Sequence, residues 1–273
     1  MKKFEGILLC SDLDGTLLRE DKSISRENLD AIEYFKSEGG YFTLVTGRMP
    51  CSARPLYEKI RPNAPIGCIN GGGIYDFETD RYLWSNTLPR DVVELIDSAV
   101  SAVPSIGVLY NTLDAVHFCR DNARMTRFRA DTGLPNKVGD YKTMDKPAAK
   151  VVLGENDVEK VFTVVETLKN HPKNSMFDYV RSEKCFYEIL PKGSSKGNLL
   201  VRLAEILGVD MAKTVAIGDY NNDVSMIKAA GVGIAVANAT DEAKAAADLI
   251  TVSNEESAIA KIINDFDVGI LKL

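Results

Sequence analysis

The sequence predicts an α/β protein: a Rossmann-like parallel-sheet core domain with an inserted α/β (α+β) domain. Three observations predict this fold class. Apolar runs typical of buried strands alternate with segments of helical periodicity near both ends of the chain. Between them the pattern changes to paired strands and helices. At 273 residues, the chain is also long enough to form two domains.

The first part of the chain follows a strand–helix–strand–helix–strand pattern. The expected strands cover residues 6–11, 41–45 and 66–69, and the expected helices cover residues 25–37 and 51–60. Gly39-Gly40 ends the first helix. Strands joined in this way form a parallel sheet with right-handed crossovers. A hairpin is expected next, at residues 73–77 and 82–86.

The middle of the chain mixes helices with paired strands, and the alternating pattern then returns. The expected helices of the middle part cover residues 88–103, 121–131 and 157–168, and its expected strands cover 106–111, 114–119, 151–153, 176–180 and 185–190. From Lys196 we expect a helix, then strands at 213–217, 232–236 and 248–251 and helices at 221–229, 240–246 and 254–265. We therefore predict one domain from residues 1–82 and 191–273, and an inserted domain over residues 83–190.

Composition limits the functional classes. The chain is 45% hydrophobic and 26% charged, as is usual for globular proteins, and its net charge is −6. A negative net charge argues against nucleic-acid and anionic-membrane partners, and no apolar run approaches the ~18 residues of a membrane span. The five cysteines are scattered without a C-x-x-C motif, which indicates reduced thiols. We expect a cytoplasmic monomer or weak homo-oligomer.

Polar residues follow several of the expected strands. These stretches contain Asp12 and Asp14, then Thr46-Gly47-Arg48, then Lys196-Gly197 at a helix start, and then Gly218-Asp219-Tyr220-Asn221-Asn222-Asp223. Ligands of open α/β sheets bind outside the carboxyl ends of the strands, where these stretches lie. Taken alone, Asp-x-Asp-Gly after a strand is also a common turn sequence. The convergence of the stretches favours a site.

This set of side chains suits phosphoryl transfer. Carboxylates hold a hard cation such as Mg²⁺, which lets neighbouring carboxylates stay ionised. A hydroxyl, helix N-terminal N–H groups and a lysine can hold phosphate oxygens. One aspartate can attack phosphorus and form an aspartyl-phosphate, and a second can protonate the leaving alkoxide and then activate water.

The four stretches resemble, in order, the motifs of the haloacid dehalogenase-like phosphatases, and most closely those of the Cof-type subfamily. Ile69-Asn70-Gly71-Gly72 and the run Gly231–Ala235, followed by Asn238-Ala239, add to the resemblance. It covers the whole core and, more loosely, the inserted domain. One departure is Ala235-Val236-Ala237-Asn238, where the family often has a Met-Gly-Asn pattern. This departure affects a packing segment and leaves the chemistry in place.

The resemblance implies a role for each matching residue. Asp12 is implied as the nucleophile and a metal ligand, and Asp14 as the general acid/base with its backbone carbonyl on the metal. The implied substrate-binding residues are Thr46, Gly47, Arg48, Lys196 and Asn222. The implied metal-binding residues are Asp12, Asp14, Asp219 and Asp223. Two assignments stay open: Asp223 can instead orient Lys196 or favour a helix N-terminus, and Arg48 can instead form a salt bridge.

The resemblance implies a Mg²⁺-dependent phosphatase that hydrolyses small phosphorylated metabolites, such as sugar phosphates or a phosphorylated cofactor, through an aspartyl-phosphate. The inserted domain is implied to be a cap that sets substrate specificity, and its four clustered arginines are either a solvated stripe or substrate contacts: Arg120, Arg124, Arg127 and Arg129. One alternative is a phosphomutase of the same fold. Another is a phospho-acceptor switch, which Asp14 disfavours because it suits hydrolysis of the intermediate.

A serine hydrolase is a further reading of the chain, because residues 193–197 match the G-x-S-x-G pattern of nucleophile elbows. That fold needs its histidine after the serine in chain order. The two histidines, His117 and His171, both precede Ser195, so no histidine completes the triad.

Overall fold

The computed structural model describes residues 2–272, and these form two compact units. The core unit consists of the chain up to Gly47, the segment Arg54–Trp84 and the chain from Ser195 onward. The inserted unit consists of Arg48–Ala53 and Ser85–Ser194. The predicted domain ranges also include residues 1 and 273, which lie outside the described residues. The predicted fold class is confirmed in both units.

A five-stranded parallel sheet forms the centre of the core unit, with strand order β13-β12-β11-β1-β2. Its strands are β1 Leu8–Ser11, β2 Tyr41–Leu44, β11 Thr214–Gly218, β12 Val232–Ala235 and β13 Leu249–Ile250. β1 and β11 are buried at every position, as the apolar runs predict for inner strands of a parallel sheet.

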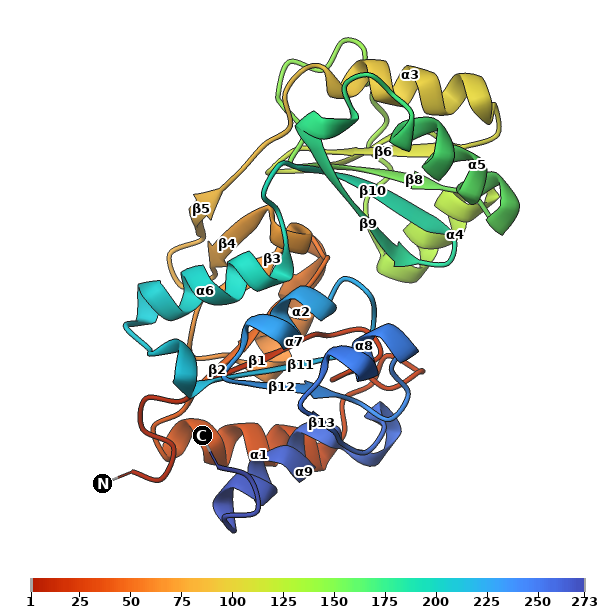
Figure 1. The fold of residues 1–273 in the computed structure, drawn as a ribbon. Helices are drawn as coiled ribbons and strands as arrows, with labels where there is room; N and C mark the ends of the chain where they lie inside the picture. The colour runs from red at the N-terminus through yellow and green to blue at the C-terminus, as the bar shows by residue number, and fades with distance from the viewer. Residues whose placement is uncertain (1, 273) are drawn as a thin grey trace. The chain divides into compact units, whose positions relative to one another are not determined.

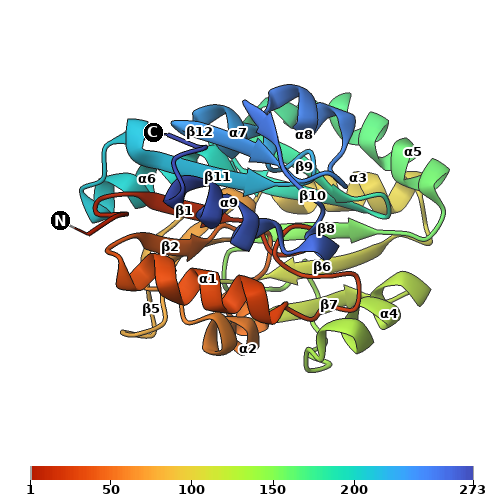
Figure 2. The ribbon, with the colours of Figure 1, turned by 90° about the horizontal axis from the view of Figure 1, so that it is seen from below.

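Helices cover both faces of this sheet. They are α1 Arg26–Ser37, α2 Pro50–Ile60, α6 Lys196–Leu207, α7 Val224–Ala229, α8 Asp241–Ala246 and α9 Ala258–Asp267, with a 3₁₀ turn, η3, at Met211–Lys213. Helices α1 and α9 lie side by side on one face, and α6 and α7 lie on the other (Figures 1 and 2). α1 begins where the Ser25 hydroxyl accepts the N–H of Asn28 (3.1 Å), and it buries Ile32 and Phe35 against the sheet side of the unit.

The predicted helix over residues 254–265 is wrong in one respect, because Ser257 divides it. Ser257 has φ +62°, a left-handed conformation that separates the 3₁₀ turn η4 (Asn254–Glu256) from α9. The Ser257 hydroxyl contacts the Ser25 hydroxyl at 2.9 Å. The buried residues Asn254 and Ala258 are four positions apart, a helical spacing that continues across the break, so the pattern alone conceals it.

The third predicted strand is not part of the parallel sheet. β3 (Ile66–Cys68) pairs antiparallel with β4 (Gly73–Asp76), and β5 (Arg81–Ser85) completes a separate three-stranded sheet. A parallel bridge between Val45, just after β2, and Gly67 of β3 connects this small sheet to the parallel sheet. The physical reason is the 3₁₀ turn η1 (Ile69–Gly71), which reverses the chain after a three-residue strand and brings β4 alongside.

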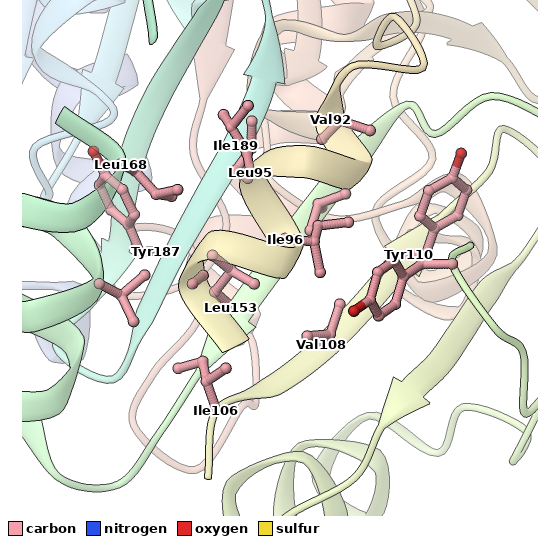
Figure 3. Packing of buried hydrophobic residues seen from close by; sticks show 14 of the residues in the cluster. Val92, Leu95, Ile96, Ile106, Val108, Tyr110, Leu153, Leu168, Tyr187 and Ile189 are labelled. Carbon is pink, nitrogen blue, oxygen red and sulfur yellow. The ribbon is translucent and has the colours of Figure 1, made fainter. Parts of the chain in front are cut away.

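The inserted unit has a five-stranded antiparallel sheet of order β7-β6-β8-β10-β9. Its strands are β6 Gly107–Asn111, β7 Val116–Arg120, β8 Lys150–Gly154, β9 Phe177–Glu183 and β10 Phe186–Pro191, and its helices are α3 Val92–Ala102, α4 Ala123–Thr132, α5 Val158–Lys169 and the 3₁₀ turn η2 Asn174–Met176. Figure 3 shows the core of this unit, in which α3 and α5 bury side chains such as Leu95, Ile96 and Leu168 against Val108, Leu153 and Ile189 of the sheet.

Leu153 belongs to this core because successive side chains of a strand alternate between the two faces, and alternate residues of β8 face α3 and α5.

Two further properties of residues 2–272 bear on function. None of the helices in this range combines the length and the apolar character that crossing a bilayer requires. All five cysteines are free thiols.

Candidate active site

The four sequence stretches lie where strands end or a helix begins. Asp12 follows β1, Thr46 follows β2, Asp219 follows β11, and Lys196 is the first residue of α6. β1 pairs in parallel with both β2 and β11, so their carboxyl ends share one edge of the sheet. The sheet topology therefore brings these side chains to a common edge.

Lys196 connects two of the aspartates. Its side chain is 1% exposed, and its Nζ donates to Oδ1 of Asp12 and Oδ1 of Asp223, each at 2.5 Å. Ser195 caps α6, since its hydroxyl accepts the N–H of Asn198 at 3.0 Å. The serine of the G-x-S-x-G match is therefore a helix cap, which fixes the helix start from which Lys196 extends.

Asp223 is fully buried and uses both of its oxygens. Oδ2 accepts the backbone N–H groups of Asp219 and Tyr220, each at 3.0 Å, while Oδ1 contacts Lys196. Asp223 also stands at the N-cap position of α7, without a side-chain cap bond. It therefore holds the loop after β11 in place and fixes the ammonium group of Lys196.

One carboxylate oxygen from each of Asp12, Asp219 and Asp223 lies within 4.8 Å of the others. Asp219 is positioned by Thr16, whose hydroxyl donates to its Oδ1 at 2.8 Å. Gly15 makes room for it: a Cβ at Gly15 would lie 2.5 Å from Oδ2 of Asp219, and Gly15 has φ +84°. Glycine is thus required here both by the backbone conformation and by the carboxylate beside it.

Replacing Gly15 tests this packing. Gly15→Ala must adopt a left-handed conformation, which costs roughly 1–2 kcal/mol, and must also displace the Asp219 carboxylate. Gly208→Ala is the matched control, because Gly208 has φ +66° and an added Cβ meets nothing within 4 Å. We expect Gly15→Ala to lower the free energy of unfolding in urea by more than the control does. Equal losses would show that Asp219 does not restrict this position.

The charges of this group do not balance. Burial raises the pKa of Asp12 well above its ordinary value, and Asp223 and Asp219 oppose the stabilising charge of Lys196. Burial and the charge of Asp223 raise the pKa of Asp219 to about 7. Burial would lower the pKa of Lys196, but Asp12 and Asp223 hold it above its ordinary value. Three clustered carboxylates with one buried ammonium therefore suit a divalent cation, and oxygen donors are the ligands that Mg²⁺ prefers.

Asp14 lies outside this three-carboxylate group. Its side chain is 40% exposed, and its Oδ1 pairs with the ammonium of Lys22 at 2.9 Å. Lys22 is a site neighbour that the sequence patterns miss. It has φ +64°, and both Lys22 and Asp14 lie outside the helices and strands, so no periodic spacing predicts their contact.

Asn70 is a second residue that the assignment of roles misses. Its Oδ1 accepts the side-chain N–H of Asn222 at 3.0 Å, and its backbone N–H donates to the carbonyl of Thr46 at 3.2 Å. A Cβ at Gly47 would lie 2.8 Å from the Asn70 amide group. Asn70 thus links Thr46, Gly47 and Asn222. Its sequence signal is an asparagine before glycines at a strand end, which favours its left-handed conformation (φ +51°).

Arg48 begins the segment Arg48–Ala53 of the inserted unit. Its guanidinium donates to the carbonyl of Ser52 at 3.5 Å.

The clustered arginines of the inserted unit have partners within that unit. Arg124 stacks on Phe186, with its guanidinium carbon 4.5 Å from the ring centroid, and Arg129 stacks on Phe118 at 4.7 Å. The Arg120 guanidinium donates to the Pro104 carbonyl at 2.7 Å. These contacts give Arg120, Arg124 and Arg129 partners inside the unit. Arg127 is 76% exposed and pairs with Asp131 at 3.7 Å, as a solvated position would.

The chain matches known proteins along nearly its whole length. Residues 9–263 match the family described as haloacid dehalogenase-like hydrolase. YitU of Bacillus subtilis, a 5-amino-6-(5-phospho-D-ribitylamino)uracil phosphatase, is 29% identical over 266 residues, which cover 95% of this chain and 97% of YitU. YbhA of Escherichia coli, a pyridoxal phosphate phosphatase, is 27% identical over 94% of this chain and 97% of YbhA. A crystal structure of a haloacid dehalogenase-like hydrolase from Bacteroides thetaiotaomicron has a TM-score of 0.83 and 29% identity, covering 94% of this chain and 98% of that one.

Proposed function

Because the chain belongs to the haloacid dehalogenase-like hydrolases and is a phosphoric monoester hydrolase, we propose that it hydrolyses sugar phosphates or a phosphorylated cofactor, with Asp12 as the nucleophile and Mg²⁺ as the cofactor. The observation that carries this proposal is the buried contact of Lys196 with Asp12, next to Asp219 and Asp223. In this contact the Asp12 carboxylate is held for attack, and the Lys196 ammonium can bind phosphate oxygens.

The first step uses Asp12, Lys196 and Asp14. Lys196 binds Oδ1 of Asp12, so we assign the attack on phosphorus to Oδ2. A bond forms between this oxygen and phosphorus while the bond from phosphorus to the leaving oxygen breaks, giving an aspartyl-phosphate on Asp12. Asp14 gives its proton to the leaving alkoxide.

The second step restores the enzyme. Asp14, now a carboxylate, takes a proton from a water molecule as the water oxygen attacks phosphorus. The bond between phosphorus and Asp12 breaks, which releases inorganic phosphate and returns the Asp12 carboxylate. Thr46, Gly47 and Asn222 hold the phosphoryl oxygens, and Asn70 fixes the amide of Asn222. We give Arg48 a substrate contact in the same proposal.

Asp12, Asp219 and the backbone carbonyl of Asp14 would hold Mg²⁺, while Asp223 acts through Lys196. When bound, the cation supplies the positive charge that screens the carboxylates from the incoming phosphate. The three-carboxylate group and its shortage of positive charge support this assignment.

Two relatives support the class of substrate. YitU is named for a phosphorylated ribitylaminouracil and YbhA for pyridoxal phosphate, and both compounds are small phosphate monoesters. A phosphomutase of the same fold would pass the phosphoryl group to a second hydroxyl, and therefore would need an acceptor other than water.

Removing divalent cations tests the proposal. After exhaustive chelation we expect phosphate release from a panel of sugar phosphates and pyridoxal phosphate to stop, because the carboxylate group then repels the phosphate. Mg²⁺ should restore phosphate release, and Mn²⁺ should substitute for Mg²⁺. Ca²⁺ should support turnover poorly, because the ion is larger and its coordination geometry is more flexible. Free phosphate should appear without an added acceptor. Full activity in metal-free protein would contradict the role of Mg²⁺, and strict dependence on an acceptor would favour the mutase.

A further inference from the structure

Lys22 lies in a tight turn of the core unit that holds it in an unfavourable backbone conformation. Its φ of +64° is in the left-handed region, which disfavours any residue with a Cβ. The Lys22 N–H donates to the Arg19 carbonyl and the Arg19 N–H donates to the Ser23 carbonyl, each at 3.0 Å. The Ser23 N–H donates to Oδ1 of Asp21 at 2.8 Å. Such a conformation persists only where the surrounding contacts fix it, and these contacts do so.

The segment that leads from the first aspartates to this turn is anchored to the C-terminal part of the same unit. Leu18 is fully buried, and its carbonyl accepts the side-chain N–H of Asn254 at 2.9 Å. The backbone N–H of Glu20 donates to Oε1 of Glu255 at 2.8 Å. The turn therefore stands on a fixed base, and the direction in which it presents its lysine is set by the fold of the core unit.

The ammonium of Lys22 is directed at Asp14. Its Nζ donates to Oδ1 of Asp14 at 2.9 Å, and within residues 2–272 it has no second partner. The two side chains are 61% and 40% exposed, and an ion pair this exposed contributes little to folding stability. Stability therefore does not explain a lysine at a left-handed position, where glycine or asparagine is favoured. What the contact does fix is the direction of the Asp14 carboxylate, because one of its oxygens is bound.

We propose that Lys22 is a positioning residue for the second step of the reaction: it holds Oδ1 of Asp14 so that Oδ2 takes the proton of the attacking water. This inference rests on the proposed function. In this step an O–H bond of water breaks, its proton goes to Oδ2 of Asp14, and the water oxygen forms a bond to phosphorus. The bond from phosphorus to Asp12 breaks, its electron pair stays on the Asp12 carboxylate, and inorganic phosphate leaves.

p-Nitrophenyl phosphate isolates this step. Its leaving group departs without a proton, so the orientation of Asp14 affects only the hydrolysis of the aspartyl-phosphate. For this substrate kcat/KM reports the steps up to formation of the aspartyl-phosphate, whereas kcat also includes its hydrolysis, and burst kinetics separate the two. A residue that positions Asp14 should therefore change kcat and leave kcat/KM unchanged, whereas a residue that contacts the substrate should change kcat/KM.

The test uses the full chain and four variants. Lys22→Met removes the ammonium and keeps a long side chain, and Lys22→Arg keeps a cation that donates hydrogen bonds. Lys22→Met combined with Asp14→Asn shows whether the effect of the lysine passes through Asp14. Lys3→Met is the matched control: Lys3 is 54% exposed and pairs with Asp267 at 2.6 Å, but it precedes the amino end of β1, away from the carboxyl ends of the strands.

Rapid mixing with p-nitrophenyl phosphate, acid quenching and mass spectrometry give the rate at which the aspartyl-phosphate decays. In Lys22→Met we expect this decay to be slower by about 10-fold, since a small misplacement of a catalytic group has effects of this order or larger. The burst of p-nitrophenolate, kcat/KM and thermal unfolding should stay unchanged. Lys22→Arg should restore most of the decay rate, and Lys3→Met should behave as the wild type. In the Asp14→Asn background, Lys22→Met should have no further effect.

Decay at the wild-type rate in a folded Lys22→Met protein would overturn this inference and leave the phosphatase function standing. A loss of kcat/KM with unchanged decay would also overturn it, because it would make Lys22 a substrate contact. So would a slower decay caused by Lys22→Met in the Asp14→Asn background. A wild type that forms no aspartyl-phosphate on Asp12 and releases no phosphate would instead overturn the proposed function, and the inference with it.

Discussion

Asp12→Asn is expected to abolish phosphate release from every substrate, with a loss on the order of 10⁴–10⁶-fold, as is typical when a nucleophile is removed. The amide cannot form the bond to phosphorus, and a weaker contact replaces the charged contact to Lys196. The measurement is the steady-state rate on p-nitrophenyl phosphate and on an alkyl phosphate. An Asp12→Asn protein with substantial activity would exclude Asp12 as the nucleophile.

Asp14→Asn and Ser195→Ala provide the contrast for that result. Asp14→Asn keeps the nucleophile, so it should slow formation of the aspartyl-phosphate from an alkyl phosphate by about 10²–10⁴-fold. Its formation from p-nitrophenyl phosphate, measured as the first-turnover burst of p-nitrophenolate, should be affected far less, because p-nitrophenolate leaves without protonation. Ser195→Ala should keep most activity, since Ser195 acts as a helix cap. An inactive but folded Ser195→Ala protein would contradict the account.

Lys196→Met is expected to destabilise the protein strongly. It leaves Asp12 and Asp223 buried without their shared cation, and breaking a buried ion pair costs roughly 3–5 kcal/mol. The measurement is the free energy of unfolding in urea at neutral pH, together with phosphatase activity, which should also be lost. Lys22→Met is the matched control, because its pair with Asp14 is 61% and 40% exposed and should contribute less than about 1 kcal/mol. Equal losses in the two variants would contradict a central role of the buried contact.

The parts of the fold that follow from local patterns were predictable from the sequence. Buried parallel strands are continuously apolar, as Leu8 and Leu9 show, and helix caps such as Ser25 follow local rules. The pairing of β3 was not predictable, because a three-residue strand is apolar in either sheet and η1 alone decides its partner. The break at Ser257 was hidden, since the buried residues Asn254 and Ala258 on either side of it keep a helical spacing.

The site divides in the same way. Because parallel strands end at one edge, Asp12, Lys196 and Asp219 could be expected to converge. The contacts that fix their geometry could not be, since Thr16 reaches Asp219 across 203 residues of sequence.

The most direct test of the central claim is to look for the phosphoryl group on Asp12. The Asp14→Asn protein forms the aspartyl-phosphate from p-nitrophenyl phosphate but lacks the base that activates water, so the intermediate should accumulate. Rapid acid quenching, digestion and mass spectrometry should then find the phosphoryl adduct on the peptide that contains Asp12, and on Asp12 itself after fragmentation. Turnover without any adduct, or an adduct on another residue, would contradict the account.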